Sequence, residues 1–293
     1  MQIINKEIDE AISAAIGETF VAESARSVGG GSINSASVIA SKSHSFFLKT
    51  NSLNYTDMFA AEVDGLNELR STGVIRVPEP ICFGETDSKT FLVLENIVMS
   101  GGKAASAENL GERLAKLHQV KAQQFGWYRN NTIGATTQIN SQSDSWIDFY
   151  RKHRLAFQLS LAEEQGYGGE LQNLGRQLCD KLSYFFHSYQ PYPALLHGDL
   201  WSGNYAYDSD AEPVIFDPAT YYGDREADIA MTELFGGFST SFYGAYNDAL
   251  PLDDGYMVRK TLYNLYHILN HLNLFGSGYH AQAISMMKQL LSE

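Results

Sequence analysis

The chain has 293 residues, of which 44% are hydrophobic and 19% are charged, and its formal net charge is −13. This balance predicts a folded globular protein rather than a disordered one. Binding to nucleic acid depends on clustered Lys and Arg side chains. Because the sequence contains no extended run of these residues, we expect no nucleic-acid partner.

The cysteines and the N-terminus indicate the cellular compartment. Cys82 and Cys179 lie far apart in the sequence, so they predict two buried thiols rather than a disulfide framework. The first residues lack the basic and apolar segments of a signal peptide. No apolar run approaches the ~20 residues that a membrane span needs. We therefore expect a cytoplasmic protein without a membrane partner.

The first 96 residues predict a small α+β lobe. Isoleucines repeat at every fourth position near the N-terminus, which is typical of an amphipathic helix, and short β-prone runs containing Gly and Ser follow. A turn with two prolines at 77–80 leads into further strand-like runs. The expected helices cover residues 4–17 and 57–72, and the expected strands include 45–49, 81–84 and 90–95.

Residues 97–293 predict a larger and mainly helical lobe, because leucines recur there at helical spacing. One region interrupts the helices. Short apolar runs at 194–196 and 214–216 are each followed by polar residues that cannot remain in a core. Such a pattern brings acidic side chains to the mouth of a cleft.

Three oxygen-bearing side chains in this region predict phosphoryl transfer. Asp199 follows His197 and Gly198, Asn204 comes five residues later, and Asp217 ends the next strand. Mg²⁺ prefers carboxylate and amide oxygens, so Asn204 and Asp217 are suitable ligands. Asp199 then remains to accept the proton of the attacking hydroxyl. The alternative is structural, with Asp199 as a helix cap and Asn204 in a turn.

Three upstream features complete the pattern of a kinase. Lys49 ends a hydrophobic strand, and the following helix offers Glu62 or Glu68 as its partner; we prefer Glu62 because it borders the apolar face. In kinases a strand lysine binds the α- and β-phosphates and is held by a helix glutamate. A glycine turn lets backbone N–H groups approach phosphate. The remaining nucleotide-binding candidates are Gly29, Gly30, Gly31 and Ser32 in that turn, and Leu94, Glu95, Asn96 and Ile97 at the connection to the larger lobe.

With these residues identified, the sequence resembles the fructosamine (ketosamine) kinases, within the aminoglycoside-phosphotransferase-like branch of the kinase fold. The resemblance covers nearly the whole chain. Its strongest segments are 197–204 (HGDLWSGN), 216–219 (FDPA), 222–231 (YGDREADIAM) and 234–238 (LFGGF). It implies an α+β, two-lobed protein-kinase-like fold, with a nucleotide-binding lobe at 1–96 and a catalytic and substrate-binding lobe at 97–293.

The resemblance also implies an activity and roles for individual residues. The expected reaction is ATP- and Mg²⁺-dependent phosphorylation of a ketosamine, at the 3-hydroxyl beside the keto carbon. Elimination would then free the amine, so the implied role is the repair of glycated small molecules or glycated protein lysines. By matching positions, Asp199 is the base and Asn204 and Asp217 are the metal ligands. Lys49 and Glu62 form the phosphate-binding pair, the backbone of Glu95 and Ile97 meets adenine, and Asp228 braces the catalytic loop.

Other implied roles come with an alternative. Trp201, Asp224 and Arg225 are candidates for the sugar pocket, although Asp224 and Arg225 could instead form a structural salt bridge. Many members of the family carry cysteine where this chain has Ser32, so redox control through the glycine-rich loop is not expected to carry over.

Three competing functions would each leave a different pattern in the sequence. A choline or aminoglycoside kinase of the same fold would use the same acidic residues, but the segment 222–226 (YGDRE) argues against it. A non-catalytic pseudokinase would lack the lysine, the base or a metal ligand, and none is missing. His267 and His271 are four residues apart, yet no glutamate follows His267, so the pattern of a zinc enzyme fails.

Overall fold

A computed structural model describes residues 4–29, 33–103 and 105–293. It divides into two compact units. The first unit comprises Met1–Ser106 and Tyr205–Asp217, and the second comprises Ala107–Asn204 and Pro218–Glu293. Among the described residues, no helix is both long and apolar enough to cross a bilayer.

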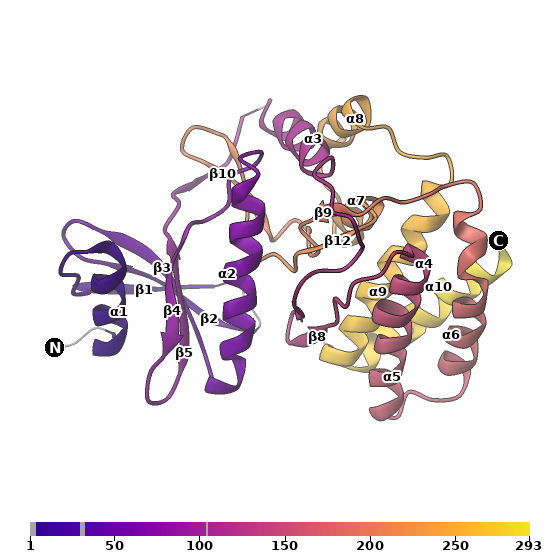
Figure 1. Ribbon diagram of the computed structural model, residues 1–293, viewed down its shortest axis with the longest axis horizontal. Helices are drawn as coiled ribbons and strands as arrows, with labels where there is room; N and C mark the ends of the chain where they lie inside the picture. Colours follow the sequence, from indigo (N-terminus) through magenta and orange to yellow (C-terminus); the bar gives the residue numbers. More distant parts are fainter. Residues whose placement is uncertain (1–3, 30–32, 104) are drawn as a thin grey trace. The chain divides into compact units, whose positions relative to one another are not determined.

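The first unit is built on an antiparallel sheet whose strands lie in the order β1-β2-β3-β5-β4. Helices α1 and α2 flank this sheet on opposite faces (Figure 1). The predicted helices and strands of this lobe are all present, with small shifts at their ends. The bounds are α1 Lys6–Ile16, β1 Ser24–Val28, β2 Ser35–Ala40, β3 Ser45–Asn51, a 3-10 turn Leu53–Tyr55, α2 Thr56–Ser71, β4 Pro80–Glu85 and β5 Thr90–Glu95.

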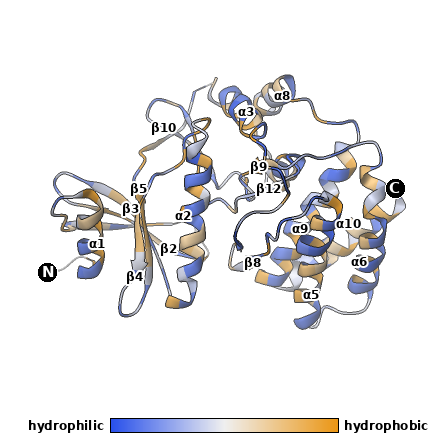
Figure 2. Cartoon of the chain, viewed as in Figure 1, coloured by the Kyte–Doolittle hydropathy of each residue, from blue (hydrophilic) through white to orange (hydrophobic). Residues whose placement is uncertain are grey.

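Alternation along β3 assigns its side chains to the two faces of the sheet. Phe46 and Leu48 join the hydrophobic cluster that Ile8 and Ile12 of α1 form with the sheet. Lys49 is the next residue and therefore points to the other face, toward α2. Figure 2 shows hydrophobic colouring along the central strands of this sheet.

The boundary predicted between residues 96 and 97 differs from the observed division. The strands β10 (Tyr205–Asp208) and β11 (Pro213–Ile215) form a small sheet with β6 (Met99–Ser100) and belong to the first unit. The backbone explains this, because the N–H of Ile215 donates to the carbonyl of Arg76 at 3.0 Å. Residues 97–106 and 205–217 therefore belong to the first unit, whereas the chain between them belongs to the second.

The second unit is mainly helical, as expected, and the long helix α9 packs against α5, α7 and α10. Helices α3 and α8 approach closely at Gly111, where a Cβ atom would lie 2.4 Å from the carbonyl oxygen of Phe242. The bounds are α3 Ser106–Leu117, α4 Trp146–Tyr150, a π-helical segment Arg151–Leu155, α5 Ala156–Glu164, α6 Glu170–Lys181, a 3-10 segment Leu182–Phe186, α7 Glu226–Leu234, α8 Thr240–Ala249, α9 Tyr256–Phe275, a 3-10 turn Ser277–Tyr279 and α10 His280–Ser292.

Two short strand pairs in the second unit were not predicted as such. The hairpin of β7 (Asn131–Ile133) and β8 (Thr136–Gln138) lies in a region read as helical. The strand β12 (Tyr221–Gly223) pairs with β9 (Ala194–Leu196). Each of these strands has only three residues, which is too few for an alternating pattern to show in the sequence.

Candidate active site

Lys49 forms a compact ionic triad in the first unit. It is 4% exposed, and its Nζ lies 2.5 Å from Oε1 of Glu62 and 2.6 Å from Oδ1 of Asp217. The predicted contact between Lys49 and Glu62 is thus present. The sequence did not predict the contact with Asp217, which lies 168 positions further along the chain.

The triad places one positive charge between two carboxylates. Burial alone would lower the pKa of Lys49, but the carboxylates of Asp217 and Glu62 outweigh burial and raise this pKa above its ordinary value. Burial raises the pKa of Glu62, and the Lys49 ammonium opposes that rise. The lysine therefore stays charged at neutral pH, which a phosphate-binding group requires.

Asp217 has an unusual backbone conformation. Its φ angle is 57°, in the left-handed region that non-glycine residues rarely adopt. The side chain is 48% exposed, although one oxygen contacts Lys49. Rare backbone conformations of this kind cluster at functional sites, where surrounding contacts maintain them.

The connection after β5 is fixed by Arg76, which the sequence analysis missed. Its guanidinium donates to Oε1 of Glu95 at 2.6 Å and to Oδ2 of Asp208 at 2.5 Å. The N–H of Glu95 donates to the carbonyl of Glu79 at 2.8 Å. The predicted adenine contact of Glu95 would therefore have to use its carbonyl, because its N–H is already bonded.

The other nucleotide-binding candidates have varied surroundings. Leu94 is buried in β5, and Ile97 is nearly buried after it. The Asn96 side chain donates to the hydroxyl of Ser45 at 2.8 Å. Gly29 is exposed at the end of β1, whereas Gly30, Gly31 and Ser32 lie outside the described residues.

In the second unit, Asp199 and Asn204 lie together in the loop after β9. Nδ2 of Asn204 donates to the carbonyl oxygen of Asp199 at 2.8 Å and approaches its Oδ2 at 3.3 Å. Within the described part of the chain, the nitrogen of Asn204 makes these side-chain bonds, so its Oδ1 remains as a ligand for a cation. An amide oxygen of this kind suits Mg²⁺.

Asp228 anchors the backbone of this loop. Its carboxylate accepts the N–H of His197 at 2.7 Å and the N–H of Gly198 at 2.8 Å. His118 lies 3.2 Å from Oδ2 on the other side. Burial would raise the pKa of Asp228, but the hydrogen bond from His118 and the loop N–H groups lower it below its ordinary value. A charged Asp228 carboxylate thus holds two consecutive N–H groups of the loop.

Gly198 could not be another residue. Its φ angle is 85°, and a Cβ atom there would lie 2.1 Å from the carbonyl oxygen of Ala219. The N–H of Ala219 also donates to the carbonyl of His197 at 2.8 Å. The backbone of Ala219 therefore leaves no space for a side chain at the position before Asp199.

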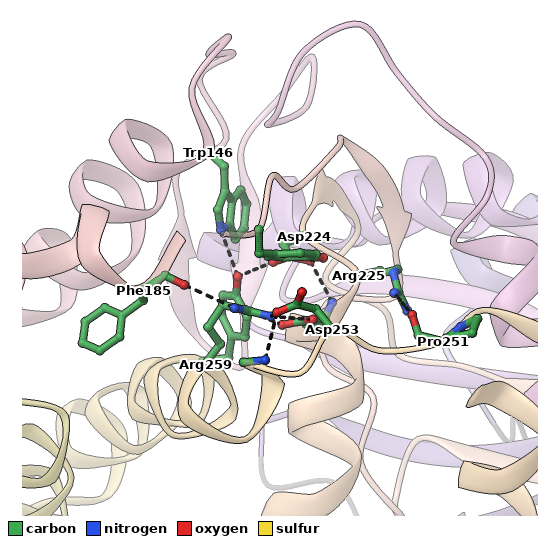
Figure 3. A network of polar contacts seen from close by, with 11 residues as sticks. Trp146, Phe185, Asp224, Arg225, Pro251, Asp253 and Arg259 are labelled. Carbon is green, nitrogen blue, oxygen red and sulfur yellow. Dashed lines mark hydrogen bonds and ion pairs between the residues drawn. The ribbon is translucent and has the colours of Figure 1, made fainter. Parts of the chain in front are cut away.

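Asp224 and Arg225 are buried in a structural network rather than offered to a ligand (Figure 3). Asp224 is fully buried and accepts hydrogen bonds from the hydroxyls of Tyr189 at 2.9 Å and Tyr263 at 2.5 Å. Arg225 donates to the carbonyl oxygens of Leu250 and Pro251. The geometry therefore favours the structural alternative for both residues, although the two do not form the salt bridge that the alternative envisaged.

Glu226 and Arg259 form the ion pair of this network. Glu226 is fully buried and receives two hydrogen bonds from Arg259, at 2.7 and 3.0 Å. Arg259 also contacts Asp253 at 2.6 Å and the carbonyl of Phe185 at 3.2 Å (Figure 3). Asp224 and Glu226 thus fasten the start of α7 to α9 through Tyr263 and Arg259.

Trp201 packs against a neighbouring aromatic ring. It is half-buried, and its ring packs edge-on against Phe235 with centroids 6.4 Å apart. Phe235 in turn contacts the ring of His271 at 4.8 Å. Nδ1 of His271 bonds the carbonyl of His267 at 2.8 Å, which is ordinary packing within a helix. Nothing in the sequence connects Phe235 and His271 with Trp201.

The structure therefore brings the predicted residues together in two sets. Lys49, Glu62 and Asp217 form one set, and Asp199 and Asn204 form the other with His197 and Asp228 behind them. The convergence of the two sets on one cleft remains a prediction.

Comparisons with known proteins agree with one another. The sequence model of the fructosamine kinase family matches residues 4–293. A protein of Synechocystis named as a probable ketoamine kinase is 47% identical over 285 residues, which are 97% of this chain and 96% of that protein. A chloroplastic protein-ribulosamine 3-kinase of Arabidopsis thaliana is 44% identical over 267 residues, which are 90% of this chain and 82% of that one. The crystal structure of a candidate fructosamine-3-kinase from Haemophilus somnus superposes with a TM-score of 0.89 at 31% identity, covering 97% of this chain and 96% of that one.

Proposed function

Because this chain belongs to the fructosamine kinase family, we propose that it is an ATP-dependent ketosamine kinase that phosphorylates a sugar hydroxyl of a glycated amine. The family and the kinase-like α+β fold predicted from the sequence are confirmed by the match over residues 4–293 and by the likeness to the solved structure. The observation that carries the proposed chemistry is the buried triad of Lys49, Glu62 and Asp217.

The triad supports a nucleotide site in the first unit. A lysine held by a helix glutamate is the device with which kinases bind the α- and β-phosphates. Here Lys49 is charged and buried, so nucleotide phosphates would meet it at low dielectric, where charge pairs are strong. Leu94–Ile97 and the glycine-rich sequence 29–32, of which residues 30–32 lie outside the described part of the chain, complete the proposed ATP site.

Magnesium is the proposed metal. Asp217 offers a half-exposed carboxylate and Asn204 offers an amide oxygen, and this donor set fits a hard cation that keeps several waters. When bound, the ion would neutralise charge on the phosphates. The role of Lys49 would be to orient the nucleotide and the role of Asn204 to hold the loop that carries Asp199.

Asp199 is proposed as the base that accepts the proton of the attacking sugar hydroxyl. Its backbone is fixed through Asp228, which holds the two N–H groups before it. The 3-hydroxyl of a fructosamine or ribulosamine is the proposed acceptor, free or on a protein lysine, and release of the amine would follow by elimination. We assign Trp201 to the sugar side of the site and a cytoplasmic location to the protein.

The test combines a substrate panel with one variant. Purified protein should release ADP with ribulosamines or fructosamines and not with choline or aminoglycosides. Asp199→Asn should lower kcat by about 100- to 10,000-fold, because general base catalysis is worth that much, while ATP still binds. Asp248→Asn, an exposed aspartate on α8, is the matched control and should keep normal turnover. Near-normal turnover of Asp199→Asn would remove the assignment of the base, and ADP release with choline alone would remove the substrate class.

A further inference from the structure

The segment after Asp217 determines where the catalytic loop can lie. Ala219 meets that loop at two points: its N–H donates to the carbonyl of His197 at 2.8 Å, and its carbonyl oxygen lies 2.1 Å from where a Cβ atom of residue 198 would be. A shift of the Ala219 backbone would therefore move the residues directly before Asp199. Other contacts must therefore hold the Ala219 backbone in place.

Two buried amide side chains hold that backbone. Nε2 of Gln138 donates to the carbonyl of Ala219 at 3.0 Å, and Nδ2 of Asn131 donates to the carbonyl of Thr220 at 2.8 Å. Gln138 is 1% exposed and Asn131 is 8% exposed. The two residues face each other across the β7–β8 hairpin, where Nε2 of Gln138 also donates to Oδ1 of Asn131 at 2.9 Å. One hairpin thus binds two consecutive carbonyls of the segment.

Hydrogen-bond chemistry fixes the direction of these amides. The hydroxyl of Tyr266 donates to Oε1 of Gln138 at 2.9 Å. If the amide of Gln138 were turned over, its oxygen would face the oxygens of Ala219 and Asn131, and no donor would lie between them. Gln138 can therefore satisfy its neighbours in one orientation only, with its nitrogen toward Ala219.

Hydrogen bonds that begin at Arg154 impose the same orientation on these amides. Arg154 is fully buried in the π-helical segment Arg151–Leu155 and can only donate hydrogen bonds. Its Nη2 donates to Oδ1 of Asn140 at 2.8 Å, so Nδ2 of Asn140 is left to donate to Oδ1 of Asn131, also at 2.8 Å. Single π-helical turns are frequent at functional sites. A chain of donors therefore runs from Arg154 to the backbone beside the catalytic loop.

We propose that Gln138 is a positioning residue for phosphoryl transfer, which places Asp199 by holding the Ala219 backbone against Gly198. This proposal rests on the role of Asp199 as the base. Reactions that depend on aligned groups lose about 100-fold in rate from a displacement of about 1 Å. Gln138 touches no reacting atom, so its effect acts on kcat through the loop and leaves nucleotide binding alone.

The chain offers a matched control for the test. Gln172 of α6 is also buried, 6% exposed, and its Nε2 donates to the carbonyls of Leu159 at 2.9 Å and Tyr167 at 3.0 Å. Gln138→Met and Gln172→Met each remove a buried amide that donates two hydrogen bonds, and each keeps the side chain's length. Both variants should lose a similar amount of thermal stability. Only Gln138 contacts the segment beside the catalytic loop.

The expected result is a split between kcat and KM in one variant only. Gln138→Met should lower kcat at least tenfold and leave the KM for ATP within about twofold of the wild type, whereas Gln172→Met should leave both within about twofold. Tyr266→Phe, which removes only the hydroxyl that orients Gln138, should lower kcat in the same direction by a smaller factor. It also serves as the second test if Gln138→Met does not fold.

Two outcomes would overturn the proposal: equal kcat values in Gln138→Met and Gln172→Met, or a loss in Gln138→Met that lies wholly in KM. Asp199→Asn is measured beside them to keep the two proposals apart. If Asp199→Asn retains turnover, the base has been assigned wrongly. If it loses turnover while Gln138→Met behaves like its control, the base stands and the positioning role is wrong.

Discussion

Replacement of Lys49 by methionine tests the buried triad. The variant leaves Glu62 buried, with its side chain 10% exposed, and without the ammonium that neutralised it. Breaking a buried ion pair by removing one partner costs about 3–5 kcal/mol. Glu62 can avoid part of this cost by taking up a proton. From an ordinary pKa near 4.3, that costs at most about 3.7 kcal/mol at pH 7, at about 1.36 kcal/mol per unit. We expect Lys49→Met to lose up to about 3.7 kcal/mol of stability at pH 7.

The loss should depend on pH with a definite sign. In the variant, the pKa of Glu62 in the folded state lies above its unfolded value, so the folded state binds more protons. Stability is then lost as the pH rises, and the deficit should shrink to about 1 kcal/mol at pH 5. Hydrogen exchange of amides in β3 and α2 measures this directly, because it reports on the first unit alone.

A second substitution separates stability from activity. Lys49→Met with Glu62→Leu removes both charges and should recover most of the lost stability, since well-packed apolar residues often replace a buried pair at no cost. Turnover should stay lost, because no group would bind the phosphates. Lys260→Met is the control: its pair with Glu233 is partly exposed and should be worth at most about 1 kcal/mol. A pH-independent deficit in Lys49→Met, or no recovery in the double variant, would refute the reasoning.

Two further predictions concern the second unit. Gly198→Ala must accept a left-handed φ, which costs alanine about 1–2 kcal/mol, and it adds a clash with Ala219, so kcat should fall well beyond tenfold. Gly166→Ala, with φ 90° and open space around it, should lose only the conformational part of that stability and should keep its kcat. Equal kcat values in the two variants would refute the steric argument. Burial lowers the pKa of His267 to about 3, so the unfolded state binds more protons below pH 6.5 and the stability of the wild type falls as the pH drops. In urea unfolding, the stability of His267→Gln relative to the wild type should therefore rise by about 2 kcal/mol between pH 7 and pH 5. An unchanged difference would contradict the buried neutral imidazole.

The sequence predicted the residues whose chemistry is local and visible in a pattern. The choice of Glu62 over Glu68 depended only on which side of one helix each residue occupies, and helical periodicity determines that. Asp199, Asn204 and Asp228 stand in one recognisable arrangement; in the structure Asn204 contacts Asp199, and Asp228 contacts the backbone of the same loop. These predictions needed no knowledge of how distant segments pack.

The sequence did not predict contacts between distant segments. Arg76 joins Glu95 to Asp208 across more than one hundred residues, and nothing in its local sequence distinguishes it from a solvated arginine. Gln138 and Asn131 lie in strands of three residues, too short to show alternation. Asp224 and Arg225 looked like sugar-binding residues because polar side chains beside a catalytic motif are usually exposed, whereas here tyrosines and backbone carbonyls surround them.

The conformation of Asp217 shows most clearly why side-chain type alone was insufficient. A glycine such as Gly198 indicates a possible left-handed backbone conformation, since glycine adopts that conformation at little cost. An aspartate at φ 57° does not, because it needs support from elsewhere. That support comes from the strand before it, which is bonded to the carbonyl of Arg76, and from Lys49, whose ammonium binds its carboxylate at 2.6 Å. Besides its proposed role in binding phosphate, Lys49 is therefore the counter-charge that holds the metal-ligand candidate in an otherwise unfavourable conformation.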